Sequence, residues 1–259
     1  MTDSASLLSR LEELTLNTSP ALHQCLYDGW VLRASGTDTR RANSVTALQP
    51  SMLPIEEKIA FSEAWYRAYG QQAIFRLTEM FSPPELDDLL ARRGYTREVE
   101  TYMMTFDLAK GIRAGDYELP QGAKVVERDA AQGLDDVHRM KAVTPEQHAR
   151  DLQRQSLWRG EQIFLSLKTI NGVASTGMAR LEAGHVGIFN MRTASKARDK
   201  GYATMLVAYL LAWGVEQGAT KAFLQVDMAN DAAISVYRKF GFEPAYTYWH
   251  RVQPATVAA

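Results

Sequence analysis

The feature that most constrains this chain is a weak internal repeat at a nearly constant offset. Gly94 and Gly241 stand 147 residues apart, and Gly70 and Gly218 stand 148 residues apart. Further pairs repeat at 147 or 148, namely Gly36 with Gly184, Asn43 with Asn190, and Thr46 with Thr193. A constant spacing over about 60 residues indicates two copies of one folding unit. The repeat therefore predicts two related halves.

Length and composition agree with two small globular domains. A chain of 259 residues can form one large domain or two small ones. Apolar residues make up 46% and charged residues 23%, which excludes a disordered or fibrous chain. The stretch 110–122 carries three glycines and a proline among mixed charges, so it is the best linker candidate. We predict a first domain at 1–112, a linker at 113–122 and a second domain at 123–259.

Hydrophobic periodicity and turn residues predict the order of elements in each half. In the first half we expect helices at 6–16, 56–69 and 84–93, and strands at 30–34, 41–48, 73–78 and 99–106. In the second half we expect helices at 130–143, 145–155, 202–217 and 231–241, and strands at 124–127, 163–170, 173–181, 186–191, 221–227 and 242–252. Asn171-Gly172 predicts a two-residue hairpin turn, because both residues tolerate a positive φ. The order predicts an α/β (α+β) fold.

Charge, cysteine content and hydropathy exclude several classes of protein. The net charge is −1, from 29 Lys and Arg against 30 Asp and Glu, so we expect no nucleic-acid partner. Cys25 is the only cysteine, which rules out an internal disulfide or a four-cysteine zinc site and favours a reducing compartment. The N-terminus has an early acid, Asp3, and the longest apolar run, 202–213, is too short to span a bilayer. We therefore expect a cytoplasmic protein with no metal and no membrane partner.

The segment Arg198-Asp199-Lys200-Gly201-Tyr202-Ala203 lies between a predicted strand and a predicted helix. A helix N-terminus exposes unpaired N–H groups and the positive end of the helix dipole, which suit an anion. Gly201 allows the backbone to approach a ligand closely, and Ala203 keeps the first turn free of bulk. The loop has a local charge of +3, from Arg192, Lys196, Arg198 and Lys200 against Asp199. This pattern predicts a diphosphate site, and a solvated basic loop at a helix start is the alternative.

Arg-x-x-Gly-x-Ala at 198–203 resembles the Arg/Gln-x-x-Gly-x-Gly/Ala signature of the GNAT superfamily of acyl-CoA-dependent N-acetyltransferases. The rest of that family's core is similar to Leu224-Gln225-Val226 and to the spacing of Asn230, Ala233, Tyr237, Gly241 and Phe242. With the repeat, the resemblance implies two tandem GNAT-like domains, each with a mixed, mostly antiparallel sheet flanked by helices. Where the first copy should have its phosphate loop, 49–55 contains two prolines and no glycine. We therefore expect no coenzyme A in that half.

The resemblance implies acetyl-CoA as the cofactor and assigns its contacts residue by residue. The loop whose backbone N–H groups hold the pyrophosphate in the family maps onto Arg198, Asp199, Lys200, Gly201, Tyr202, Ala203 and Thr204. The strand edge that pairs with the pantetheine arm maps onto Asn190, Met191, Arg192 and Thr193. Asn230 would hydrogen-bond the same arm, unless it serves only as a helix cap. Tyr237 would be the general acid for the departing thiolate, because a phenol stays protonated at neutral pH; a core aromatic is the alternative.

The general base departs from a common pattern of the family, in which a glutamate stands on the strand before the signature. Here 186–193 holds no carboxylate. An ammonium acceptor still needs a proton acceptor within hydrogen-bond reach, direct or through water. The candidates are His185, Glu182, Glu146, Asp151 and a water relayed by backbone carbonyls. The acceptor pocket is equally open, since Tyr246, Tyr248, Trp249 and His250 either line it or pack the last strand.

These observations predict an N-acetyltransferase that transfers an acetyl group from acetyl-CoA to a primary amine by direct attack on the thioester. The amine belongs to a small molecule or a peptide, and the sequence selects neither. A homodimer is a candidate assembly. The alternative function is an acyl-CoA-binding sensor or interaction protein with decayed catalysis, because the strand carboxylate is missing and the first copy is degenerate.

Overall fold

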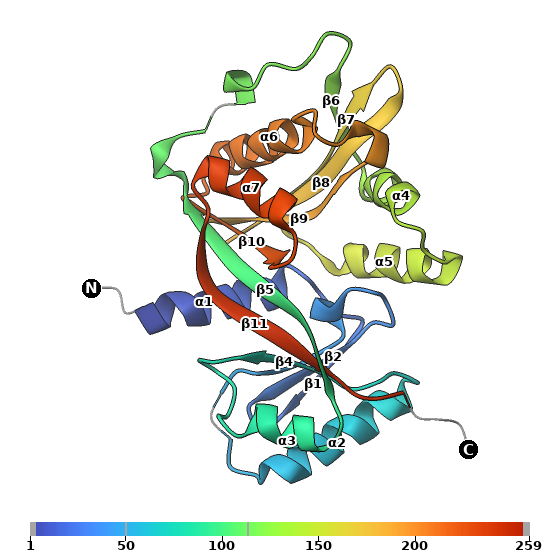
Figure 1. Ribbon diagram of the computed structural model, residues 1–259, viewed down its shortest axis with the longest axis vertical. Helices are drawn as coiled ribbons and strands as arrows, with labels where there is room; N and C mark the ends of the chain where they lie inside the picture. The colour runs from blue at the N-terminus through green and yellow to red at the C-terminus, as the bar shows by residue number, and fades with distance from the viewer. Residues whose placement is uncertain (1–3, 50, 113, 256–259) are drawn as a thin grey trace. The chain divides into compact units, whose positions relative to one another are not determined.

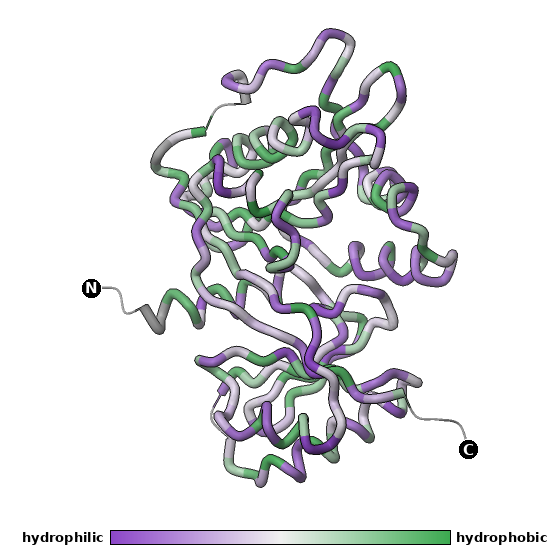
Figure 2. The backbone as a smooth tube through the Cα atoms, in the orientation of Figure 1, coloured by the Kyte–Doolittle hydropathy of each residue, from purple (hydrophilic) through white to green (hydrophobic). Residues whose placement is uncertain are grey.

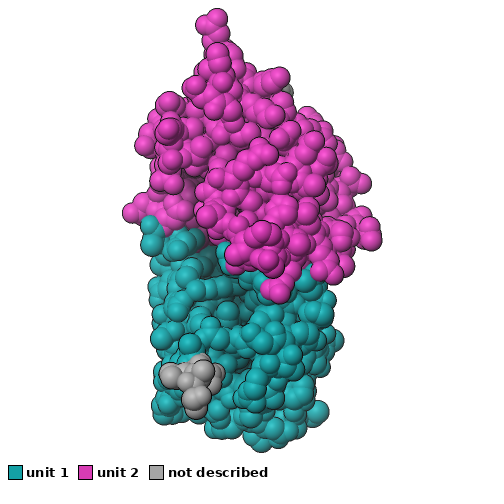
Figure 3. All heavy atoms as spheres, turned by 90° about the vertical axis from the view of Figure 1, so that its right-hand side faces the viewer, with its two compact units in different colours: residues 1–102, 227–229, 246–259 teal, residues 103–226, 230–245 magenta. Residues whose placement is uncertain are grey.

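The computed structural model describes residues 4–49, 51–112 and 114–255. The chain divides into two compact units, which Figure 3 shows in different colours. Unit 1 takes residues 1–102, 227–229 and 246–259, and unit 2 takes residues 103–226 and 230–245. Each unit therefore contains segments from both halves of the chain.

Unit 1 is a sheet flanked by helices (Figure 1). Its elements are α1 (Ser4–Asn17), β1 (His23–Tyr27), β2 (Trp30–Ala34), β3 (Val45–Ala47), α2 (Ile55–Ala68), β4 (Ile74–Thr78), α3 (Leu86–Arg92) and most of β5 (Thr96–Asp107). The strands are hydrogen-bonded in the order β1-β2-β3-β4-β11-β5. β3 and β4 run parallel, because α2 carries the chain from the end of one strand to the start of the other. The registered pairs β1–β2, β2–β3 and β4–β11 are antiparallel.

Unit 2 shows a similar order of elements. It contains β6 (Lys124–Arg128), α4 (Ala130–Met140), α5 (Pro145–Leu157), β7 (Gln162–Thr169), β8 (Gly172–Glu182), β9 (His185–Thr193), α6 (Tyr202–Glu216), most of β10 (Lys221–Asp227), α7 (Asp231–Phe240) and the start of β11 (Glu243–Val252). The strand order is β5-β10-β9-β8-β7-β6. β9 and β10 are parallel and are connected through α6, as the parallel strands β3 and β4 are connected through α2. The two units therefore share an order of elements, which agrees with the repeat in the sequence. That the two halves are copies of one domain stays a prediction.

The last strand of each half passes from one unit to the other. β5 begins in unit 1 and ends in unit 2, where the Leu108 N–H donates to the Thr220 carbonyl at 2.9 Å. β11 begins in unit 2 and then pairs with β4 of unit 1, with Tyr248 opposite Thr78. The compact units therefore do not follow the predicted division in chain order, because these two strands are exchanged. The domain boundaries themselves stay a prediction.

Each unit has an apolar core between its helices and its sheet. In unit 1, the core joins strand residues to α2 and α3, and it includes Trp30, Leu32, Val45, Phe75, Leu77, Trp249, Ile59, Tyr66, Leu86 and Leu90. In unit 2, Figure 2 shows mainly hydrophobic residues along α6 and mainly hydrophilic residues along α5. A Cβ on Gly214 of α6 would lie 2.7 Å from Val186 Cγ1, so α6 packs directly on β9. None of the described helices is long and apolar enough to cross a membrane.

Most predicted helices and strands are confirmed, and the differences have local causes. β1 was not predicted, because its sequence His-Gln-Cys-Leu-Tyr lies at a largely exposed edge and shows no clear alternation. The predicted strand 41–48 shortens to β3, because Arg40–Ala42 forms a 3-10 helix. The hairpin prediction was wrong by one residue. Thr169 pairs with Gly172, whose φ is +100°, so the turn residues are Ile170 and Asn171.

Candidate functional site

The parallel strands β9 and β10 separate toward their carboxyl ends. Among the described residues, their registered pairs end at Ile188 opposite Leu224, although β9 continues to Thr193 and β10 to Asp227. The other edge of β9 still pairs with β8 as far as Thr193. The segment 190–193 therefore presents one edge that no registered strand covers. Its main-chain groups can pair with an extended ligand, as an added strand would.

A bulge in β9 produces this separation. The register between β8 and β9 shifts between Thr176 and Met178, and Asn190 has a positive φ of +54°. Such an extra residue bends its strand and increases the local twist. The Asn190 Nδ2 group donates to Met178 Sδ at 3.4 Å. The Met191 thioether packs directly over Gly177, so the part of Met191 offered to the site is its backbone.

The loop before α6 ends in a helix N-terminus without a side-chain cap. Gly201 is the N-cap residue, in the left-handed region at φ +77°. Within the described part of the chain, the N–H groups of Tyr202, Ala203 and Thr204 have no acceptor, as expected for the first turn of an uncapped helix. Asp199 also has a positive φ, of +60°. Such a turn followed by an uncapped helix N-terminus is an arrangement with which backbone N–H groups bind an anion.

The charges around this loop favour an anion as well. The basic side chains are exposed and form no ion pair with the described residues; they are Arg192, Lys196, Arg198 and Lys200. Because none of these side chains is ion-paired with a described carboxylate, and Asp199 offsets only one of the four charges, their positive potential remains available to a ligand. The sequence-predicted loop and strand edge therefore lie at the two ends of one short connection, 194–201, in unit 2.

Asn230 and Tyr237 lie on the helix that follows β10. The Asn230 side chain caps α7 by accepting from the Ala233 N–H at 3.1 Å, which confirms the predicted cap. Tyr237 lies on the same face of α7 as Ile234 and Phe240, and it is 7% exposed. Its ring meets Phe242 edge to face, with 6.0 Å between the centroids. α7 packs beside α6, so both residues belong to the same part of unit 2 as the loop. Their roles toward a ligand stay predictions.

Two of the four side chains considered as general bases lie far from the open edge of β9. His185 begins β9 and stands opposite Glu182 of β8. Asn190 follows five residues later, roughly 16 Å along the strand at about 3.3 Å per residue. Direct proton transfer requires hydrogen-bond distance. The structure therefore argues against His185 and Glu182 as the base.

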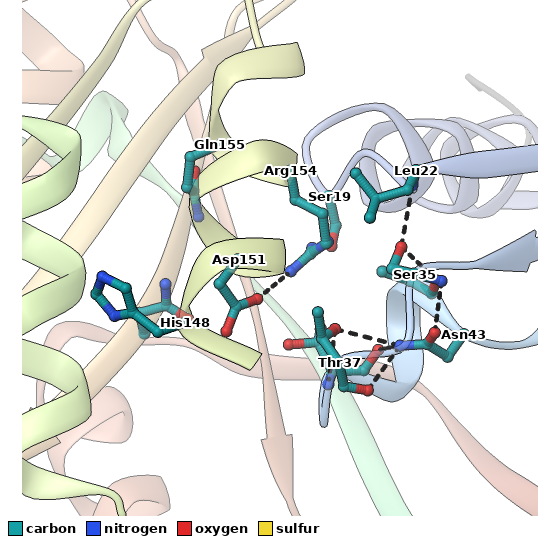
Figure 4. A network of polar contacts seen from close by, with 12 residues as sticks. Ser19, Leu22, Ser35, Thr37, Asn43, His148, Asp151, Arg154 and Gln155 are labelled. Atoms are coloured by element: carbon teal, nitrogen blue, oxygen red, sulfur yellow. Dashed lines mark hydrogen bonds and ion pairs between the residues drawn. The ribbon is translucent and has the colours of Figure 1, made fainter. Parts of the chain in front are cut away.

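The other two candidates lie on α5. Glu146 is exposed in the first turn, where the helix backbone and the Thr144 hydroxyl hold the pKa of its carboxyl below the usual value. Asp151 accepts from Arg154 Nη1 at 2.9 Å, an ion pair that Figure 4 shows on α5. Asp151 Oδ2 also lies 3.2 Å from His138 Nε2 of α4. Asp151 is therefore part of a polar cluster that joins the two helices.

Sequence reasoning missed the histidines of this cluster. The Nδ1 atoms of His138 and His148 lie 2.6 Å apart, so one proton must lie between them. Burial lowers the pKa of His138, and the Asp151 carboxylate opposes this only in part. The imidazole of His138 is therefore neutral at neutral pH, and both of its ring nitrogens have partners. No spacing signal pointed to this pair, because its members stand on different helices ten residues apart.

Comparisons with known proteins fit this geometry. A sequence model of the family described as "Probable histone acetyltransferase Rv0428c C-terminal" matches residues 5–251. The relative described as "Uncharacterized N-acetyltransferase YobR", from Bacillus subtilis (strain 168), is 27% identical over 247 residues, which are 95% of this chain and 98% of the relative. The GCN5-related N-acetyltransferase from Kribbella flavida has a TM-score of 0.71 at 18% identity, over 98% of this chain and 97% of its own. A tandem GNAT protein from the clavulanic acid biosynthesis pathway has a TM-score of 0.63 at 13% identity, over 95% of this chain and 88% of its own.

These matches extend over both halves of the chain. They confirm the predicted mixed α/β fold, with a large, mostly antiparallel sheet flanked by helices, and the predicted resemblance to GNAT proteins. Together they support acetyltransferase activity of the GNAT type. The chain belongs to the family described as "Probable histone acetyltransferase Rv0428c C-terminal", and its fold is that of the GCN5-related N-acetyltransferases.

Proposed function

We propose that this protein transfers an acetyl group from acetyl-CoA to a primary amine, by direct attack of the amine on the thioester. The observation that carries the proposal is the combination of an uncovered strand edge at 190–193 with an uncapped helix N-terminus at 202–204. The edge suits the amide groups of a pantetheine arm, and the helix N-terminus suits a diphosphate. Because only the short connection 194–201 separates the strand edge from the helix N-terminus, one extended ligand with a pantetheine arm and a diphosphate would contact both.

Different residues around this connection would bind different parts of acetyl-CoA. The N–H groups of Tyr202, Ala203 and Thr204 would bind the diphosphate oxygens, and the exposed arginines and lysines of the loop would attract them over a longer range. Because the side-chain oxygen of Asn230 already caps α7, its Nδ2 group is the part that would donate to the arm. Bound acetyl-CoA would supply the thioester carbon that the amine attacks.

Two protons must move during the transfer. The Tyr237 hydroxyl would give its proton to the thiolate sulfur as that group departs, since phenols are protonated at neutral pH. The ammonium form of the acceptor must lose a proton before it can attack. Glu146, Asp151 and a water held by backbone carbonyls remain as its acceptors.

The acceptor amine belongs to one of two classes. The matched family is described as a probable histone acetyltransferase, which makes the side-chain amine of a protein lysine the first class to test. A small-molecule amine is the second. Both classes require the same attack on the thioester, so the donor site can be tested before the acceptor is known.

Calorimetry with acetyl-CoA and a turnover assay test the proposal. We expect wild-type protein to bind acetyl-CoA and to release thiol when offered a panel of amines and histone-derived peptides. Tyr237→Phe should keep the affinity for acetyl-CoA and lose turnover by about 100-fold, the size of a general-acid contribution. Absence of acetyl-CoA binding to the wild type would refute the proposal.

An acyl-CoA sensor is the second candidate function, because β9 carries no carboxylate from His185 to Thr193. A sensor would bind acetyl-CoA as the enzyme does. It would release no thiol with any amine of the panel, and Tyr237→Phe would change nothing. The turnover assay therefore distinguishes the two functions.

A further inference from the structure

The two helices α4 and α5 differ in how they are held in unit 2. α4 packs on β7 and β8 and buries the apolar side chains of Leu134 and Val137. α5 packs on α4, and the side chains that it buries are the polar ones of Arg154 and Gln155. All of α5 is described, and none of its apolar side chains is buried. Because apolar burial supplies most of the free energy that holds a helix in place, α5 depends on polar contacts.

Three short contacts join α5 to α4 through two histidines and two aspartates. His138 Nδ1 of α4 lies 2.6 Å from His148 Nδ1 of α5. His138 Nε2 lies 3.2 Å from Asp151 Oδ2 of α5, and His148 Nε2 lies 3.5 Å from Asp135 Oδ1 of α4. Figure 4 shows His148, Asp151 and Arg154 along α5, where Arg154 Nη1 donates to Asp151 Oδ1 at 2.9 Å. We call His138, His148, Asp135 and Asp151 the histidine latch.

The three contacts of the latch are complete in only one protonation state. Each contact joins two atoms that can both carry a lone pair, so each contact needs one proton between its atoms. Two neutral imidazoles carry two ring protons, and three are required. The arrangement therefore holds one imidazolium, which lies between the two carboxylates. A fourth proton would place N–H groups on both sides of the 2.6 Å contact, where two cations would repel each other.

The elements packed against α4 add further charged groups around the latch. Asp136 of α4 is ion-paired with Arg128 of β6 and with Arg139 of α4. Arg180 of β8 donates to the side chains of two glutamines, and Lys141, which follows α4, opposes a positive charge on the histidine of α4. Among the described residues, no charged side chain of β7 or β9 is hydrogen-bonded or ion-paired with either histidine of the latch. Arginine stays charged throughout, so the histidines are the groups that change charge near neutral pH.

We propose that the histidine latch is a pH switch, which holds α5 on α4 near neutral pH and releases it as the pH falls. Burial lowers the pKa of His138, the Asp151 carboxylate opposes this shift, and the His148 ring adds to it. The closed latch therefore resists the fourth proton, whereas His138 without α5 beside it would take that proton up at the ordinary value near 6.5. Since the open form binds more protons, the closed form loses stability as the pH falls below about 6.5.

The switch concerns the placement of α5 and uses none of the residues assigned to acetyl-CoA. It therefore goes beyond the proposed acetyl transfer, and either proposal can fail alone. Where both hold, release of α5 would also move Glu146 and Asp151, two of the candidate proton acceptors. Acid would then reduce turnover while acetyl-CoA binding persists.

Hydrogen–deuterium exchange of the full chain without acetyl-CoA, followed by mass spectrometry at about pH 7.5 and about pH 5, tests the switch. EDTA in every sample excludes a metal ion bridging the two Nδ1 atoms, and the rates are corrected for the intrinsic pH dependence of amide exchange. We expect the corrected exchange of α5 to rise by about tenfold or more at the lower pH, since opening takes up one proton. The apolar helix α6 is the internal control and should exchange equally at both pH values.

Variants of the latch separate the switch from a general loss of stability in acid. His138→Gln removes the ring that takes up the fourth proton, so the ratio of the two exchange rates of α5 should fall to about one. His23→Gln, which removes an exposed imidazole of unit 1, is the matched control and should keep the wild-type ratio. In His148→Gln, the NMR signal of the His138 ring should titrate closer to its ordinary pKa, because a neighbouring positive charge is lost. Exchange of α5 that does not change with pH in the wild type, or a wild-type ratio in His138→Gln, would overturn the proposal.

Discussion

The loops before α2 and α6 hold the same place in the element order of their units, and they differ in what binds their N–H groups. In unit 1, the Asp28 carboxylate accepts from the Met52 N–H at 3.0 Å and from the Leu53 N–H at 2.9 Å. Lys58 of α2 is fully buried, and its Nζ lies 3.3 Å from Asp28 Oδ2. In unit 2, no described side chain accepts from an N–H group of the loop 194–201, and neither α2 nor α6 has a side-chain cap. The first loop is thus filled by a carboxylate of the chain itself, and the second is open to a ligand.

This difference gives a physical reason for the expectation that coenzyme A does not bind to the N-terminal half. An anion would have to displace Asp28, whose pKa is held below its usual value by the Leu53 N–H, the Met52 N–H and Lys58. Such a carboxylate stays charged and bound at neutral pH. That expectation stays a prediction.

The helices that follow β4 and β10 differ in the same direction. At the repeat offset of 147, Tyr237 of α7 corresponds to Leu90 of α3. Leu90 is fully buried in the core of unit 1. The first half thus has an apolar side chain where the second has a phenol. Both differences support the proposal that donor binding and proton transfer reside in the second half.

The largest effect is expected from a substitution in the loop before α6, which we call the open loop (194–201). Gly201→Glu places a carboxylate beside the N–H groups of α6 and strains a residue with φ +77°. We expect it to weaken acetyl-CoA binding by about 100-fold, roughly 3 kcal/mol, measured by calorimetry. Gly218→Glu is the matched control, because Gly218 follows the other end of α6 with φ +83° and open space around it. Equal affinities of the two variants would show that strain in α6, and not the loop, governs binding.

A smaller effect is expected when the loop before α2, which we call the closed loop (49–54), loses the Asp28 carboxylate that its N–H groups bind. Asp28→Asn removes the charge that the Met52 and Leu53 N–H groups bind, so calorimetry should show unfolding at a lower temperature. The exposed Asp88 provides the control, since Asp88→Asn changes the net charge equally. Acetyl-CoA should stabilise both variants as it stabilises the wild type. Wild-type unfolding of Asp28→Asn would mean that the loop does not need its internal anion.

The pH dependence of this effect has a definite sign. The pKa of Asp28 is lower in the folded protein than its ordinary value. Its stabilising contribution is therefore present above about pH 4, the unfolded value, and is lost as the pH falls through the folded pKa. The difference in unfolding temperature between wild type and Asp28→Asn should shrink below about pH 4. A difference that grows with acidity would contradict the assignment.

Much of the second half could be predicted, because its signals are local. The apolar run 202–213 predicted α6, and the Asn230 cap and Gly241, with φ +97°, marked the two ends of α7. The exchange of β5 and β11 could not be predicted, because the alternation in a strand is the same whichever strand lies beside it. The bulge at Asn190 depends on its register with β8, and the Asp28 contacts join residues 24 and 25 positions apart. In the sequence, the loop before α2 therefore differed only by its two prolines and its lack of glycine.

A modest effect is expected at the cap of α7. Two substitutions of Asn230 separate its role as a helix cap from its proposed role as a donor to coenzyme A. Asn230→Ala removes the oxygen that accepts from the Ala233 N–H, so urea unfolding should show a loss of about 1 kcal/mol. Asn230→Asp keeps a capping oxygen and should keep the stability. If the amide also donates to coenzyme A, Asn230→Asp should bind acetyl-CoA more weakly than the wild type does. Unchanged affinity would leave Asn230 as a cap alone.

The smallest effect concerns long-range attraction to the open loop. Arg198 is exposed and makes no ion pair with the described residues, so Arg198→Gln should change binding of acetyl-CoA only through its charge. At low salt we expect a loss of affinity of about threefold, which should disappear near 1 M salt, where the Debye length is about 3 Å. Arg67→Gln, at the exposed end of α2, makes the same change in net charge within unit 1 and should leave the affinity unchanged. If Arg67→Gln weakened binding equally, the net charge of the whole protein would be responsible, and the contrast between the two loops would rest on their backbone alone.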